Sequence, residues 1–135
     1  MESIRKSEIE KAFEKSYRIY LTGHLQKPQP MLEHIDDDIE VGLSEYEHFT
    51  ADTPHVHPVC TEHGMVLKGA LRMKLLETGE EMEYHEGDFF VLRPGNPYAT
   101  KNAPGTRILF IKYPAVNDKT PIEVDDETRK WLGQW

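Results

Sequence analysis

His55 and His57 are the side chains whose type and spacing are best suited to chemistry. On a β-strand, residues two apart project from the same face, about 6.6–7 Å apart along the chain. Two imidazoles placed in this way can bind one metal ion, and Glu62 follows closely enough to add a carboxylate once the chain turns after Pro58. This ligand set leaves open positions and suits divalent Zn, Fe, Mn or Ni. Taken alone, however, a His-x-His pair is more typical of a polar strand face.

The segment that must position these residues has the sequence pattern of an all-β domain. From Pro54 onward, short apolar runs alternate with turn signals about every ten residues, which is typical of a sandwich or barrel. The predicted strands are 65–67, 71–76, 82–85, 89–92, 98–101 and 107–112. If Glu62 faces the interior, strand alternation places Gly64 and Val66 there too, and we expect the Leu71, Met73 and Leu75 face inside as well.

The flanks of this segment predict further elements. Apolar residues at helical spacing, with Ser7 and Glu10 spaced as a capping box, predict a helix from Ser7 to about Leu21. Residues 35–46 alternate in period two and predict a strand. Residues 125–132 predict a short terminal helix capped by Asp125.

Two stretches of the sequence together resemble the cupin superfamily. His55, His57, Glu62 and Gly69 have the spacing of the first cupin motif, and residues 87–98 resemble the second. The resemblance covers roughly residues 40–113. It implies an all-β, cupin-type double-stranded β-helix (a jelly-roll barrel) with an N-terminal helix and a short C-terminal helix. The expected division is a helical segment, 1–27, packed on a barrel, 28–118, followed by a tail with a short helix, 119–135.

The second motif departs from the family pattern at Tyr98, where the family's fourth metal ligand, a His, is expected. A phenol has a pKa near 10 and is a poorer ligand at neutral pH. Tyr98 is therefore a candidate catalytic acid/base, a hydrogen-bond donor to substrate, a ligand or a packing residue. Arg93, which replaces a Pro of the motif, and Asn102, at its Asn position, are the other candidate substrate-binding residues.

Three functions are consistent with these residues. The first is a metal-binding small cupin that holds a divalent metal with His55, His57 and Glu62 and binds a small molecule, neutral or anionic. Dioxygenase, isomerase and lyase activities all occur in the family, so an enzyme is not specified. The second is a sensing or binding module, with or without metal. The third is a metal-free cupin resembling nucleotide-sugar epimerases, in which Tyr98 and His act as acid and base.

Composition narrows the partners. The 135 residues carry 16 Lys and Arg against 24 Asp and Glu, a net charge of −8. This balance disfavours nucleic acid and anionic membranes. No signal peptide or membrane span is visible, and the single Cys60 fits a reducing compartment, so we expect a cytoplasmic protein. The resemblance also implies a homodimer, with residues 39–43 as the candidate edge strand.

The acidity is unevenly distributed along the chain. Residues 29–48 contain seven acids and no Lys or Arg, whereas the two motif windows carry a net positive charge. An anionic ligand near the metal is therefore compatible with the sequence, and Arg93 is the residue expected to contact it.

Overall fold

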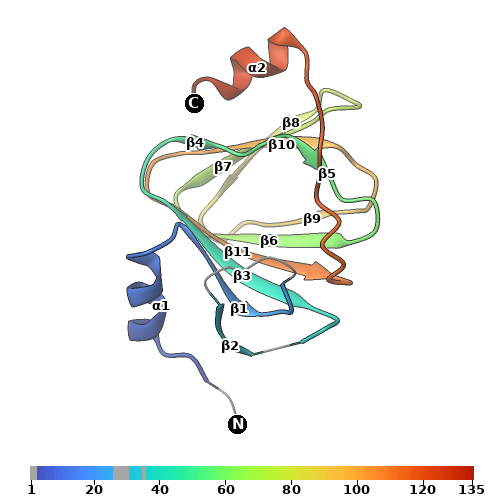
Figure 1. Cartoon of the computed structure of the whole chain (residues 1–135). Helices are drawn as coiled ribbons and strands as arrows, with labels where there is room; N and C mark the ends of the chain where they lie inside the picture. The colour runs from blue at the N-terminus through green and yellow to red at the C-terminus, as the bar shows by residue number, and fades with distance from the viewer. Residues whose placement is uncertain (1–2, 26–30, 35) are drawn as a thin grey trace.

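The computed structural model describes residues 3–25, 31–34 and 36–135 (Figure 1). Its elements, in chain order, are α1 (Lys6–Phe13), β1 (Arg18–Thr22), β2 (Met31–His34), β3 (Glu40–Tyr46), β4 (Thr50–Ala51), β5 (His55–Val56), β6 (Thr61–Lys68), β7 (Ala70–Leu75), β8 (Glu81–His85), β9 (Phe89–Leu92), β10 (Tyr98–Asn102), β11 (Thr106–Tyr113), β12 (Thr120–Pro121) and α2 (Asp126–Leu132).

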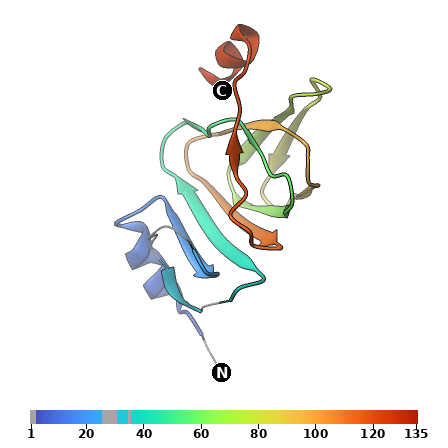
Figure 2. The same cartoon turned by 45° about the vertical axis from the view of Figure 1, so that its right-hand side comes forward.

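The strands form two sheets that face each other across the core. One sheet has the order β2-β1-β3-β11-β6-β9, and the other has the order β12-β5-β10-β7-β8, with β4 also paired to β10. Figures 1 and 2 show the two sheets wrapped around a common interior, with α1 and α2 at opposite ends of the molecule. The predicted all-β barrel with a helix at each end is confirmed.

The core lies between the sheets and is built from alternate residues of each strand. Leu71 and Met73 of β7 are buried, as predicted, and Leu75 packs partly buried against them. On β6, Gly64 and Val66 are buried, again as predicted. Phe90, Leu92 and Ile108, among others, complete the cluster from the facing strands. This parity directs the side chain of Glu62 toward the same interior.

The prediction of a helix continuing to Leu21 is wrong, because α1 ends at Phe13. Residues 18–22 form β1, which pairs with β3 through Ile19 opposite Leu43 and Tyr20 opposite Gly42. Ile19 is β-branched and Tyr20 is aromatic, types that favour strands, and both are buried on β1. These residues therefore belong to a barrel sheet and not to a helical segment 1–27; residues 1–2 and 26–27 lie outside the described ranges.

The N-terminal capping box also starts earlier than expected. The Glu8 carboxylate accepts a hydrogen bond of 2.7 Å from the Arg5 backbone N–H, so the helix begins at Lys6 and the predicted pair, Ser7 and Glu10, does not cap it. Glu10 instead binds Arg107 on β11, at 2.9 Å between Oε1 and Nη1. This ion pair ties α1 to the outside of the barrel.

The predicted dimer edge at residues 39–43 is also wrong. Strand β3 lies between β1 and β11 and pairs with both, so its backbone hydrogen bonds are already used. The strand predicted over 35–46 begins at Glu40, and residue 35 lies outside the described residues. The homodimer itself stays a prediction. Neither described helix is long and apolar enough to cross a membrane.

The C-terminal helix forms as predicted. Asp125 Oδ1 accepts a 2.8 Å hydrogen bond from the Thr128 N–H and caps α2. The Lys101 ammonium on β10 donates to the Trp131 and Gln134 carbonyls, at 2.8 and 2.7 Å. Helix α2 therefore covers the outer face of β10, and the inner face of β10 is left to the barrel interior.

Candidate functional site

The structure brings His55, His57 and Glu62 together inside the barrel. His55 lies on β5, His57 follows that strand, and Glu62 comes from β6 in the opposite sheet. Each residue offers one ligand atom, and the three atoms lie within 4.8 Å of one another. Both imidazoles are at least 94% buried. The three predicted metal ligands therefore form one compact, largely buried cluster.

The outer nitrogen of each imidazole is held by an oxygen. His55 Nδ1 lies 2.7 Å from the Thr53 carbonyl, and His57 Nδ1 lies 2.8 Å from Asp118 Oδ1. A carbonyl and a carboxylate only accept hydrogen bonds, so each ring carries a proton on Nδ1. In the neutral ring, Nε2 then keeps its lone pair and faces the cluster. This orientation is the one that metal-ligating histidines use.

Tyr98 supplies a single hydroxyl proton to the cluster. Its oxygen lies 2.7 Å from His55 Nε2 and 3.2 Å from Glu62 Oε2. His57 Nε2 lies 3.2 Å from Glu62 Oε2 but has no hydrogen-bond partner among the described residues. With both imidazoles neutral, three buried acceptor atoms thus converge on one donor. A divalent cation would satisfy all three acceptors, so these residues fit a metal.

Electrostatics favour the protonation states that a metal needs. Burial lowers the pKa of His55 to about 4, so this ring is neutral at pH 7. Burial raises the pKa of Glu62, but the adjacent His57 and Lys112 outweigh burial and hold that pKa at about 2. Burial and the charge of Glu62 raise the pKa of Tyr98 well above its ordinary value, so its hydroxyl stays protonated. At pH 7, His55 is thus a neutral imidazole and Glu62 a carboxylate, and the Tyr98 phenol lies beside them as a hydrogen-bond donor.

Asp118 is a residue that sequence reasoning missed. Besides holding His57, its Oδ2 accepts hydrogen bonds from the Val59 and Cys60 N–H groups, at 2.7 and 2.9 Å. Burial opposes ionisation, but these donors hold the pKa of Asp118 well below its ordinary range. Asp118 lies 61 residues from His57 in the chain, and no motif spacing connects the two. Only the folded chain reveals this contact.

A second grouping, His57, Cys60 and Asp118, also has ligand atoms close together. It is a poorer metal site. Burial raises the pKa of Cys60 to about 12, which keeps the thiol protonated, and both Asp118 oxygens already accept hydrogen bonds. The grouping is better explained as the support that orients His57.

The candidate substrate-binding residues separate in the fold. Tyr98 and Asn102 both line a cavity of about 60 Å³ in the barrel interior. Asn102 is fully buried and donates from Nδ2 to the Thr50 carbonyl at 3.4 Å, while its Oδ1 has no partner among the described residues. Arg93 is exposed in the turn after β9 and is not among the residues that line this cavity.

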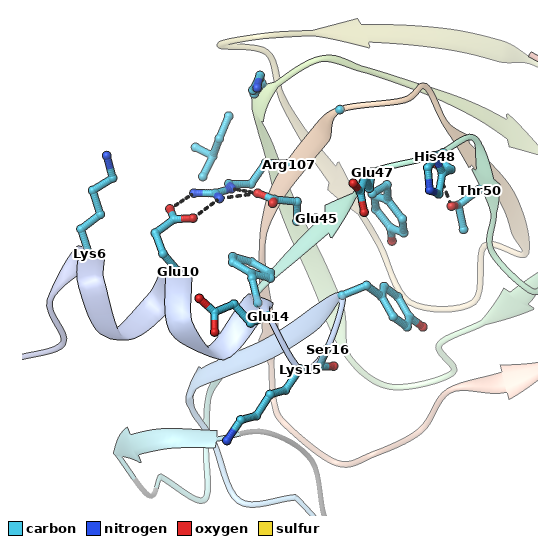
Figure 3. A pocket seen from close by; sticks show the side chains of 16 residues that line it. Lys6, Glu10, Glu14, Lys15, Ser16, Glu45, Glu47, His48, Thr50 and Arg107 are labelled. Carbon is cyan, nitrogen blue, oxygen red and sulfur yellow. Dashed lines mark hydrogen bonds and ion pairs between the residues drawn. The ribbon is translucent and has the colours of Figure 1, made fainter.

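A larger hollow lies elsewhere, between α1 and the outer surface of the barrel (Figure 3). Arg107 crosses it and bonds Glu10 on one side and Glu45 on the other. No predicted site residue lines this groove, and within the described ranges no trio of metal-ligating side chains gathers there. We therefore place the site in the barrel interior, although the interior cavity is smaller.

Substitution of Tyr98 tests its part in the cluster. Tyr98→Phe removes a hydrogen-bond donor and frees the His55 lone pair, so we expect metal affinity to change by less than about tenfold, the lower end of what outer partners contribute. Tyr98→His adds an imidazole at this position and should raise the affinity. Competition with a chromophoric chelator measures both. If Tyr98→Phe lost metal completely, Tyr98 would itself be a ligand.

Comparison with known proteins agrees with this fold. A model of the cupin domain matches residues 42–111. A search of curated proteins finds no match. Similar solved structures include KdgF from Halomonas sp., with 23% identity over 62% of this chain and 74% of that protein and a TM-score of 0.55. The polyketide cyclase RemF from Streptomyces resistomycificus matches with 18% identity over 73% of this chain and 70% of that one, at a TM-score of 0.58.

An RmlC-like cupin from Shewanella frigidimarina is also similar, with 16% identity over 62% of this chain and 72% of that chain and a TM-score of 0.54. At these identities the structural similarities establish the fold alone. The family model spans more than half of the sequence and includes His55, His57, Glu62 and Tyr98. The chain belongs to the cupin family.

Proposed function

We propose that this protein binds one divalent metal ion, Zn, Fe, Mn or Ni, through His55, His57 and Glu62, and binds a small molecule in the barrel beside it. The observation that supports this most strongly is the excess of acceptors. His55 Nε2, His57 Nε2 and Glu62 Oε2 share a single proton donor, the Tyr98 hydroxyl. Buried acceptors without donors are costly unless a cation satisfies them.

The residues around the ligands have separate parts in this proposal. Asp118 and the Thr53 carbonyl fix the two imidazole rings, and Tyr98 holds a proton at the edge of the cavity. The metal, when bound, would act as a Lewis acid toward a small molecule at its open positions. Asn102 lies about 13 Å from Tyr98 along β10, at another part of the cavity that both residues line.

A second candidate is acid/base chemistry without metal. The 2.7 Å contact between the Tyr98 hydroxyl and His55 Nε2 favours it, because such a pair can exchange a proton with a bound substrate. The acid/base candidate leaves His57 Nε2 without a hydrogen-bond partner among the described residues, whereas the metal proposal gives this nitrogen a role as a ligand. We therefore rank the metal site first. The cytoplasmic location stays a prediction.

Metal loading tests the proposal directly. The protein, purified without a His tag and stripped with a chelator, is dialysed against Zn, Mn, Ni and, under anaerobic conditions, Fe(II). Mass spectrometry of the metal content should then find about one equivalent of at least one metal, as expected for one cluster of three ligands. A protein that retains none of the four metals contradicts the proposal and favours the acid/base candidate.

A further inference from the structure

The barrel cavity borders a second hollow, and the residues that line both are positively charged. This second hollow, of about 410 Å³, is lined in part by the exposed residues Val116 and Asn117 and therefore opens to solvent. Among the described residues, the two spaces share three lining residues, and all three are cations: Arg18, Lys112 and Lys119. We call these three residues the neck. They come from β1, β11 and the segment before β12.

The neck cations are only partly neutralised by their neighbours. The Arg18 guanidinium lies 3.7 Å from Asp52, and the Lys112 ammonium lies 3.3 Å from Glu40. Lys119 has no hydrogen bond or ion pair with any described residue. The inner cavity is lined by these three cations against two carboxylates, Asp52 and Glu62. A metal bound by Glu62 would increase the excess of positive charge further.

The neck also has hydrogen-bond donors to spare. Arg18 donates from Nε to Ser44 Oγ at 2.9 Å and from Nη2 to Tyr46 Oη at 3.1 Å, which leaves Nη1 without a hydrogen bond to the described residues. A guanidinium has five N–H donors and an ammonium has three, so most donors of the neck are unused. Charged donors at the partly desolvated boundary between two cavities form an attractive site for an anion.

We infer that the neck binds the carboxylate of a small anionic molecule, which enters through the outer hollow and reaches the barrel cavity beside Glu62 and His55. This inference rests on the proposed function, because it names the class of molecule bound there. A cavity of about 60 Å³ holds roughly four to six non-hydrogen atoms, given about 10–15 Å³ for each water-sized occupant. That size fits a short-chain carboxylic acid. Arg93, where the sequence predicted the anion contact, does not line this cavity, so we assign the contact to the neck instead.

Calorimetric titration of the chelator-treated protein tests the neck without the metal. The probes are acetate, lactate, pyruvate and malonate, each beside its uncharged amide, together with inorganic phosphate. At least one carboxylate should bind, and its amide should not. Lys119→Gln should lower the affinity for that carboxylate by about tenfold, the effect of losing one charge-assisted hydrogen bond. Lys119 is exposed, so this variant should fold.

A matched control is Lys130→Gln, which removes the same charge from the exposed surface of α2 and should leave carboxylate affinity unchanged. The inference is overturned if no carboxylate binds, if amides or phosphate bind more tightly, or if Lys119→Gln has no effect. Zinc affinity of Lys119→Gln separates the two proposals, because the neck is not a metal ligand. Unchanged zinc binding with weakened carboxylate binding in Lys119→Gln supports both proposals, whereas a wild-type protein that binds carboxylate but no zinc contradicts only the metal site.

Discussion

Replacing His57 with alanine should lower metal affinity by more than about 100-fold, beyond the range observed when only an outer partner of a ligand is changed. His57 has the one imidazole nitrogen in the cluster without a hydrogen-bond partner, and Asp118 already holds its other nitrogen in the orientation for binding. Without this ring, two ligands remain, and a two-ligand site competes poorly with water. Competition with a chromophoric chelator, under the conditions used for wild type, measures the loss.

Two further variants should give an intermediate loss of metal affinity and no loss, for comparison with His57→Ala. Asp118→Asn keeps the shape of the side chain but removes one carboxylate oxygen, so we expect metal affinity to fall by about 10–100-fold. His85→Ala removes an exposed imidazole whose only described contact is an ion pair with Glu83, and it should bind metal as wild type does. If His57→Ala and His85→Ala retained metal equally well, the cluster would not be the site.

Gly64→Ala should destabilise the fold by about 2–3 kcal/mol, the upper part of the range for overpacking in a core. Gly64 lies directly opposite Phe90 on β9, and the Phe90 ring covers it. A Cβ at Gly64 would lie 2.1 Å from Phe90 Cζ, a distance that real Cβ atoms essentially never show. The ring would have to move into the barrel cavity, which it lines. Urea unfolding followed by circular dichroism measures the loss.

A second substitution separates this clash from a general effect on the strand. Phe90→Leu leaves a shorter side chain opposite Gly64, so Gly64→Ala should cost less in the Phe90→Leu background than in wild type. The double-mutant cycle gives the coupling between the two positions. Equal costs in both backgrounds would show that the Phe90 ring does not set the requirement for glycine.

The ligands of the candidate site could be predicted from the sequence because they lie close together in it. His55, His57 and Glu62 span eight residues, and strand parity is a local property, so their common direction follows from alternation. Asp118 and Arg18 could not be predicted in this way. They reach the site by long-range pairing, 61 residues from His57 for Asp118 and through the docking of β1 on β3 for Arg18.

The end of the N-terminal helix was mispredicted for a related reason. Ile19 and Leu21 fit either a helix face or an alternating strand, and local pattern alone does not choose between them. Pairing of Ile19 with Leu43 on β3, more than twenty residues further along the chain, stabilises the strand instead of the helix. Tertiary contacts thus override propensity at the point where the chain joins the barrel.

The placement of β1 has a consequence for what family membership can reveal. The cupin match, residues 42–111, contains the three proposed metal ligands, whereas Arg18, Lys112, Asp118 and Lys119 all fall outside it. The matched core thus carries the proposed metal site, and the segments outside the match carry the neck and the support of His57. Two proteins with the same core but different flanks can therefore keep one chemistry and exchange substrates, so selectivity in this chain should be sought in the segments that the family does not define.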